Sequence, residues 1–203
     1  MKTLIAYYSL YGHVKALADA IGEGASEVSG NTVEKKRIPE TLPPEIIEQM
    51  GATEAQKQFS SIPEVQPEDL TQADLIFLGS PTRYGNLPAQ VATFLDQTGG
   101  IWLKGALVGK VGSAFSSSAT QHGGNEMTLG GIHRFMLHQG MVLVGLPYSF
   151  AGQMITTEVT GGSPYGITTV AGTQGERMPS DNELQGARFQ GKHAAGIAAK
   201  MLG

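Results

Sequence analysis

Cysteine is absent from this sequence of 203 residues. Without thiols, the chain forms no disulfides, thiolate zinc sites or iron–sulfur clusters, and it has no cysteine nucleophile. Long apolar runs are missing too, so no segment has the length of a transmembrane helix. The first residues lack the basic and apolar regions of a secretory signal. These absences favour a reducing compartment, and we expect a cytoplasmic protein without integral membrane contact.

Positive charge is also scarce, because 14 lysines and arginines stand against 18 aspartates and glutamates, for a net charge of −4. A nucleic-acid-binding protein needs clustered basic residues to neutralise phosphates. The one short cluster, residues 35–37, is typical of a solvated strand end, so we expect no nucleic-acid partner. His133 and His138 are five residues apart, unlike the i, i+4 histidines of zinc proteases. We therefore predict no metal site.

What the sequence does contain is an alternation of strand-length apolar runs with amphipathic stretches. Strands are expected at residues 2–8, 32–38, 75–79, 108–115 and 141–144, and helices at 14–28, 87–97, 126–139 and from a capping box at Ser180 and Glu183 to about residue 202. Such alternation predicts βαβ units and a mostly parallel sheet. A doubly wound sheet binds ligands at the carboxyl ends of its strands. The pattern alone does not fix the strand order.

Two segments fall outside this alternation. Residues about 40–67 are rich in proline and have mixed polarity, so we interpret them as an insertion with a short helix at 44–50. Residues about 145–180 are rich in glycine, proline, threonine and serine and show little periodicity. A structureless loop of that length is unusual unless it has a function. Because this segment also carries Tyr148, Phe150 and Tyr165, we expect an ordered lid or a subunit contact.

The joint between the first strand and the first helix, residues 9–14, suits a bound phosphate. A helix N-terminus has unpaired N–H groups and a partial positive charge. Ser9 can add a hydroxyl, Gly12 allows close approach of the backbone, and His13 can add a donor. An ordinary helix cap explains this stretch equally well. The stretch matches neither the Walker A motif nor the GxGxxG fingerprint, which disfavours ATP and Rossmann-type binding.

Two further loops follow predicted strand ends, and they read SPTRYGNLPAQ and SSSATQHGG. Because the carboxyl ends of parallel strands meet at one edge, we expect all three loops to converge there. An arginine and an aromatic residue can flank a planar ring, while serine, glutamine and backbone N–H groups can bind its edge. Together the loops favour a planar cofactor that carries a phosphate over three ordinary turns.

In these loops and beyond, the sequence resembles the WrbA family of flavodoxin-like NAD(P)H:quinone oxidoreductases. The motifs that carry the resemblance are YYSLYGH, PETLPPE, SPTRYGN, FLDQTGGIW, FSSSATQHGG, HQGMV and GGSPYG, which together span nearly the whole chain. Electron-carrier flavodoxins differ by a first loop of the Thr-x-Thr-Gly-x-Thr kind. The resemblance implies an α/β fold: a flavodoxin-like doubly wound parallel sheet of five strands in the order 2-1-3-4-5, with helices on both faces, in a single domain over residues 1–203.

The same resemblance implies non-covalent FMN, NADH or NADPH as co-substrate, a quinone as substrate, ping-pong exchange and a homotetramer whose subunits wall one another's sites. The residues implied to bind FMN are Ser9, Leu10, Tyr11, Gly12, His13, Val14, Pro81, Thr82, Arg83, Tyr84, Gly85, Asn86, Ser117, Ser118, Ala119, Thr120, Gln121, His122 and His138. Tyr11 is also implied to contact the nicotinamide cofactor. The implied quinone contacts are Trp102, Tyr84 and Tyr148.

Catalytic roles follow from the resemblance for three residues. His138 would hydrogen-bond the quinone oxygen or relay a proton, Arg83 would place positive charge near the reduced flavin, and Trp102 would help to form an apolar slot. On sequence alone, a lone histidine in a helix is more often structural. A tryptophan is most often part of a core, although the position of Trp102 after Thr98 favours a loop.

Two other functions remain open. A one-electron carrier of the flavodoxin type would share the fold but is usually smaller and more acidic. A scaffold that has lost its cofactor would act through protein contacts, but the intact set of three loops disfavours it. A receiver domain is excluded, because the acidic cluster expected after the first strand is replaced by Ser-Leu-Tyr-Gly.

Overall fold

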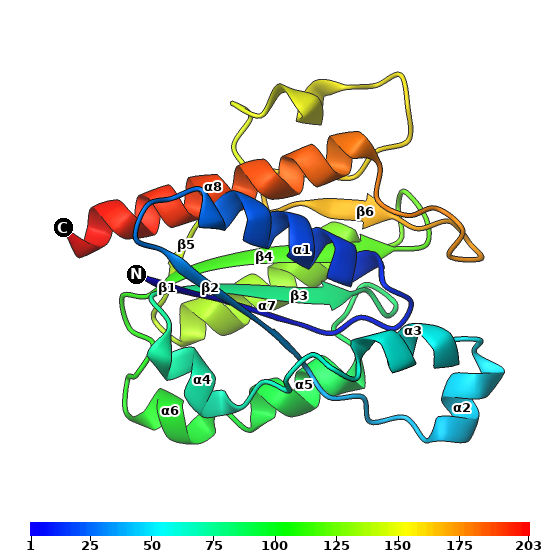
Figure 1. Cartoon of the computed structure of the whole chain (residues 1–203), viewed down its shortest axis with the longest axis horizontal. Helices are drawn as coiled ribbons and strands as arrows, with labels where there is room; N and C mark the ends of the chain where they lie inside the picture. Colours follow the sequence, from blue (N-terminus) through cyan, green and yellow to red (C-terminus); the bar gives the residue numbers. More distant parts are fainter.

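The computed structural model describes residues 1–203, and its centre is a parallel sheet with helices on both faces (Figure 1). Neighbouring strands follow the order β2-β1-β3-β4-β5, as predicted, and a further strand, β6, pairs with β4. The strands are β1 (Lys2–Tyr7), β2 (Thr32–Arg37), β3 (Leu75–Pro81), β4 (Val111–Ser118), β5 (Val142–Leu143) and β6 (Thr168–Val170). The helices are α1 (His13–Ser26), α2 (Pro44–Gln49), α3 (Thr53–Phe59), α4 (Pro67–Gln72), α5 (Ala89–Asp96), α6 (Gly99–Leu103), α7 (Asn125–His138) and α8 (Asp181–Leu202), with the 3-10 turn η1 (Ala151–Met154).

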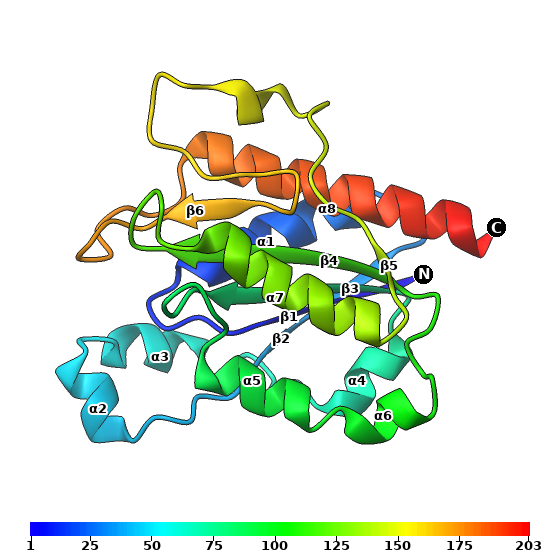
Figure 2. The same ribbon diagram turned by 180° about the vertical axis from the view of Figure 1, so that it is seen from behind.

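The core consists of two apolar layers, one on each face of the sheet. Side chains alternate between faces along a strand, so Leu4 and Ala6 of β1 enter one layer while Ile5 and Tyr7 enter the other. Helices α4 to α7 cover the first layer, and α1 and α8 cover the second (Figure 2). Burial on both faces explains why β1 and β3 are continuous apolar runs in the sequence.

Helices α1 and α8 touch through their backbones. A Cβ atom on Gly24 of α1 would clash with the carbonyl oxygen of Arg188, and one on Gly191 of α8 would clash with the carbonyl oxygen of Ile21. Glycine is therefore required at both crossing points. Outside the contact, Arg188 donates a hydrogen bond to Glu23 at 2.6 Å. The close packing at the two glycines holds α1, whose N-terminus faces the site described below, against the longest helix of the protein.

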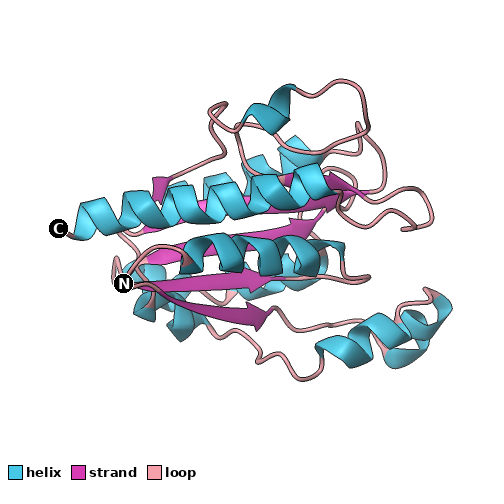
Figure 3. Cartoon of the chain, turned by 45° about the horizontal axis from the view of Figure 1, so that its top comes forward, coloured by secondary structure: helices cyan, strands magenta, loops and turns pink.

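The edge of the sheet beside β4 adds a sixth, short strand to the five predicted ones. Strand β5 pairs only with Val111 and Gly112 of β4, and β6 pairs with residues 116–118 of the same strand. The two short strands thus share one edge position, and the chain leaves the sheet between them (Figure 3). The segment 145–180, predicted to be an ordered lid or contact, contains β6 and η1. The strand escaped prediction because three residues carry no measurable periodicity.

Other differences are local. Helices α3 and α4 were not predicted, and the expected helix at 44–50 corresponds to α2. Strand β4 continues three residues past Phe115. Trp102 lies in the short helix α6, so the prediction that it occupies a loop was wrong. No helix in the structure combines the length and the apolar character needed to cross a bilayer.

Candidate active site

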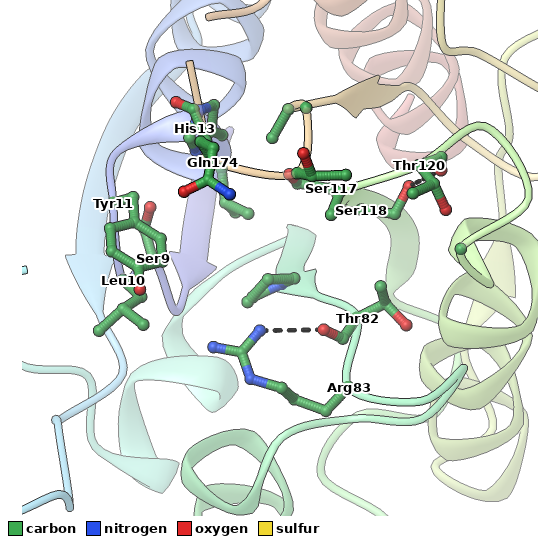
Figure 4. A pocket seen from close by; sticks show the side chains of 18 of the residues that line it. Ser9, Leu10, Tyr11, His13, Thr82, Arg83, Ser117, Ser118, Thr120 and Gln174 are labelled. Atoms are coloured by element: carbon green, nitrogen blue, oxygen red, sulfur yellow. Dashed lines mark hydrogen bonds between the residues drawn. The ribbon is translucent and has the colours of Figure 1, made fainter. Parts of the chain in front are cut away.

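A cavity of about 580 Å³ opens at the carboxyl ends of β1, β3 and β4 (Figure 4). The first loop (residues 9–14), the second loop (81–86) and the third loop (117–122) all contribute to its lining, as the parallel topology requires. A fourth loop, residues 171–175, follows β6 and closes the remaining side. The volume of the cavity lies within the usual range for small-molecule sites, about 300–1,000 Å³.

The first loop presents unpaired backbone donors to this cavity. Gly12, in the left-handed conformation at φ 109°, is the N-cap of α1, and its N–H donates to Ser9 Oγ at 3.1 Å. The N–H groups of Leu10, Tyr11, His13 and Val14 donate to no acceptor in the protein. Unpaired N–H groups at the positive end of a helix dipole form an anion site. These donors fit the phosphate of FMN, the group that the sequence predicts here.

His13 lines the cavity, but its ring serves the fourth loop. Nε2 lies 3.1 Å from the carbonyl oxygen of Gly175, which can only accept, so Nε2 carries the proton. Burial lowers the pKa of His13 below its ordinary value, although the hydrogen bond to Gly175 opposes this. The imidazole is therefore neutral at neutral pH. Nε2 is committed to Gly175, so any donation by His13 to a phosphate comes from its backbone N–H.

The second loop is a tight turn with a strained tip. Arg83 and Asn86 exchange backbone hydrogen bonds of 2.9 Å in both directions. Between them, Tyr84 has a φ of 54°, the only positive φ outside glycine, and its side chain is fully exposed. Strain of this kind is associated with functional positions. The side chain of Arg83 donates through Nη1 to Thr82 O at 2.9 Å, and Arg83 is the only lysine or arginine that lines the cavity.

The residues of the third loop line two different cavities. Ser117, Ser118, Ala119 and Thr120 line the main one, and Thr82 N donates to Ser117 O at 2.8 Å, which joins the second and third loops. Gln121 and His122 line a neighbouring cavity of about 470 Å³ instead. Tyr84, Gly85 and Asn86 are likewise absent from the lining of the main cavity.

The fourth loop was missed by sequence reasoning. Ala171 N donates to Ser118 O at 2.7 Å, and Figure 4 shows Gln174 beside His13. Gly172 and Gly175 have φ values of 82° and 69°, which favour glycine. The two glycines were a usable signal, but the β6 strand that directs the loop to the site was not predicted. Met50 and Gly51, between α2 and α3, also line the cavity unexpectedly.

An ion pair between the buried Glu183 and the partly exposed Arg177 anchors the fourth loop. Glu183 is fully buried, and both of its carboxylate oxygens accept from Arg177 Nη1, at 2.9 and 3.1 Å. Glu183 also completes the predicted capping box, because Ser180 N donates to it at 2.7 Å and Glu183 N donates to Ser180 Oγ at 3.3 Å. The remaining donors to this carboxylate are Gly161 N, Thr169 Oγ1 and Val170 N.

Trp102, His138 and Tyr148 do not reach the cavity of their own chain. Trp102 Nε1 donates to the carbonyl oxygen of His138 at 3.0 Å, so these two residues lie together. His138 ends α7, whose 14 residues extend about 20 Å from the site. The side chains of Trp102 and Tyr148 are 51% and 60% exposed, respectively. Within one chain, therefore, Trp102, His138 and Tyr148 are separated from the loops that line the cavity, although His138 was predicted to bind FMN and the other two the quinone.

Comparison with known proteins identifies the family to which the chain belongs. A family model described as NADPH-dependent FMN reductase matches residues 9–154. A protein of Geobacter metallireducens named NAD(P)H dehydrogenase (quinone) is 59% identical over the full length of both chains. One of the same name from Geobacter sulfurreducens is 57% identical, also over both full lengths.

Solved structures agree on the fold. The crystal structure of a flavodoxin, WrbA-like protein from Agrobacterium tumefaciens matches with a TM-score of 0.66 at 23% identity and covers 98% of both chains. A flavodoxin from the domain Archaea matches with a TM-score of 0.63, covering 98% of this chain and 99% of the other. The family model and the full-length relatives named NAD(P)H dehydrogenase (quinone) confirm the resemblance to flavodoxin-like NAD(P)H:quinone oxidoreductases, and the chain belongs to the NADPH-dependent FMN reductase family.

Proposed function

We propose that this protein is an FMN-dependent oxidoreductase that uses NADH or NADPH to reduce quinones to hydroquinones. The observation that carries the proposal is the set of unpaired N–H groups of the first loop, which open into a cavity shared by three other loops. Full-length relatives named NAD(P)H dehydrogenase (quinone) support the choice of substrates. Bound FMN supplies the hydride chemistry, and the protein supplies binding, orientation and electrostatics.

The four loops divide the work of holding this cofactor. The N–H groups of Leu10, Tyr11, His13 and Val14 bind the phosphate. The space for the flavin ring is lined by Thr82 and Arg83 on one side and by residues 117–120 on the other. The guanidinium of Arg83 adds positive charge there, which favours an anionic reduced ring. In this proposal Tyr11, which lines the cavity and is 44% exposed, contacts the nicotinamide.

The quinone side of the site is completed, in this proposal, by a neighbouring subunit of a homotetramer. Trp102, Tyr148 and His138 cannot act on the cavity of their own chain, because α7 carries His138 away from it. Leu137, beside His138, has a side chain that is 60% exposed, as expected of an interface residue. The neighbouring subunit would bring these residues toward Tyr84 at the strained tip of the second loop. We place the enzyme in the cytoplasm, where both nicotinamide cofactors are available.

The decisive experiment is an absorbance scan of protein reconstituted with FMN and then desalted. Under anaerobic conditions, NADH should bleach the flavin bands and benzoquinone should restore them. Bound flavin that neither NADH nor NADPH bleaches would identify an electron carrier instead. A protein that retains no flavin would refute the interpretation of the first loop. Sedimentation of wild type and Leu137→Glu tests assembly, since the variant should dissociate and lose quinone reduction while it retains FMN.

A further inference from the structure

The insertion between β2 and α4 makes three contacts with the first loop. Gln56 of α3 donates through Nε2 to the carbonyl oxygens of Ser9 and Leu10, at 2.9 and 2.8 Å. Tyr11 donates through its hydroxyl to the carbonyl oxygen of Met50 at 3.0 Å. The first loop is thus bound by a segment 39 to 47 residues further along the chain, and not only by its own helix.

The two bonds from Gln56 determine the direction of the neighbouring N–H groups. In a trans peptide unit the carbonyl oxygen and the N–H point to opposite sides. The carbonyl of Ser9 shares its peptide unit with the N–H of Leu10, and the carbonyl of Leu10 shares its unit with the N–H of Tyr11. Because Gln56 holds both carbonyls on its own side, both N–H groups point away from it, and Leu10 and Tyr11 line the cavity.

These two N–H groups are among those that have no acceptor in the protein. Without Gln56, either peptide unit could rotate and turn a carbonyl oxygen toward the anion, which would be repulsive. The side chain of Phe59, also on α3, is buried and lies next to Gly12 at the start of α1. Helix α3 therefore lies against the first loop through two residues one turn apart, Gln56 and Phe59.

We propose that Gln56 is a positioning residue for FMN, which orients the N–H groups of Leu10 and Tyr11 toward the phosphate. The inference rests on the proposed function, because it assumes that this anion is the FMN phosphate. It assigns a role to the insertion of residues 40–67, whose contribution to the site the sequence does not reveal. Gln56 touches neither the flavin ring nor the substrates, so its effect is confined to the phosphate end of the site.

The test compares FMN with riboflavin, which has the same ring but no phosphate. Quenching of flavin fluorescence gives the Kd of each ligand for wild type, Gln56→Ala and Gln56→Met. Met preserves the length of the side chain but donates no hydrogen bond, so it separates orientation from packing. Gln58→Ala is the matched control, because Gln58 is an exposed residue of the same helix.

Both Gln56 variants should weaken FMN binding about tenfold, the net worth of two neutral hydrogen bonds. Their riboflavin affinity should stay within about twofold of wild type, because riboflavin has no phosphate for the oriented N–H groups to bind. The Gln58 variant should match wild type for both ligands. Equal losses for FMN and riboflavin, or an unchanged FMN affinity in either Gln56 variant, would overturn the inference. A wild-type protein that binds no FMN would instead overturn the proposed function.

Discussion

Removing the guanidinium of Arg177 should destabilise the protein strongly, because its partner Glu183 has no access to solvent. Truncating one member of a buried ion pair typically costs about 3–5 kcal/mol. Glu183 retains good hydrogen bonds from Gly161 N, Thr169 Oγ1 and Ser180 N, at 2.7 to 2.9 Å. These donors still solvate the carboxylate, so we take the lower end, about 3 kcal/mol, for Arg177→Met.

The expected loss converts into a measurable fall in melting temperature. For a domain of this size, 1 kcal/mol shifts Tm by about 2–4 °C, so Arg177→Met should lower Tm by about 6–12 °C. The assay is thermal unfolding of the apoprotein followed by circular dichroism. Arg188→Met is the control, because its pair with Glu23 is exposed, with side chains 43% and 59% accessible. Such a pair contributes less than about 1 kcal/mol.

A similar Tm for the two variants would refute the reasoning, since it would mean that the burial of Glu183 does not matter. The FMN affinity of Arg177→Met provides a second readout. Arg177 Nη1 donates to Val170 O at 2.8 Å, just before the fourth loop, and the substitution removes this bond while the backbone bond from Arg177 N to Ala171 O remains. FMN binding should weaken in this variant and stay unchanged in Arg188→Met.

Three other predictions concern the site, the pH response and the kinetics. Tyr84→Asn should leave Tm unchanged or raise it by a few degrees, because asparagine tolerates positive φ. The KM for benzoquinone should rise in the same variant. A lower Tm with an unchanged KM would contradict the role of Tyr84 as a strained residue that contacts the quinone. Burial lowers the pKa of His13 and His133 below 6.5, so both groups bind fewer protons in the folded state than in the unfolded state. The stability that these two groups contribute should be fully present above pH 6.5 and fall as the pH drops through the lowered pKa values. His133→Gln should therefore flatten the plot of Tm against pH between about 7 and 5. A plot identical to that of wild type would contradict this prediction. Initial rates with NADH and benzoquinone varied together should give parallel double-reciprocal lines, because the two substrates use the same space in turn, and convergent lines would exclude this scheme.

The parts of the fold that could be predicted are those with local signals. Strands β1 and β3 are continuous apolar runs because both of their faces are buried, and α1 has the apolar stripe that its position against the sheet requires. Their alternation was enough to predict that the first three loops meet at one edge. The capping box before α8 could also be predicted, because its two members, Ser180 and Glu183, are only three residues apart.

The parts that could not be predicted depend on contacts distant in sequence. Strand β6 exists because Thr168 to Val170 pair with residues 116–118, about 50 positions earlier. Helix α6 forms although it begins with Gly99 and Gly100, which are poor helix formers, because Ile101 packs in the core and tertiary contacts override propensity. The role of Gln56 is invisible in the sequence for the same reason, since nothing near it identifies the carbonyls that it binds.

The close crossing of α1 and α8 at their glycines has a consequence for the folding of the protein during its synthesis. A chain emerging from the ribosome offers its N-terminal segments first, and 165 residues separate Glu23 from Arg188. Until α8 has been synthesised, the face of α1 that holds Gly24 has no partner, and the helix that begins at the first loop is held from one side only. A nascent chain would thus carry all of its first three loops yet bind FMN poorly. Cofactor loading should therefore follow the synthesis of residues 181–202.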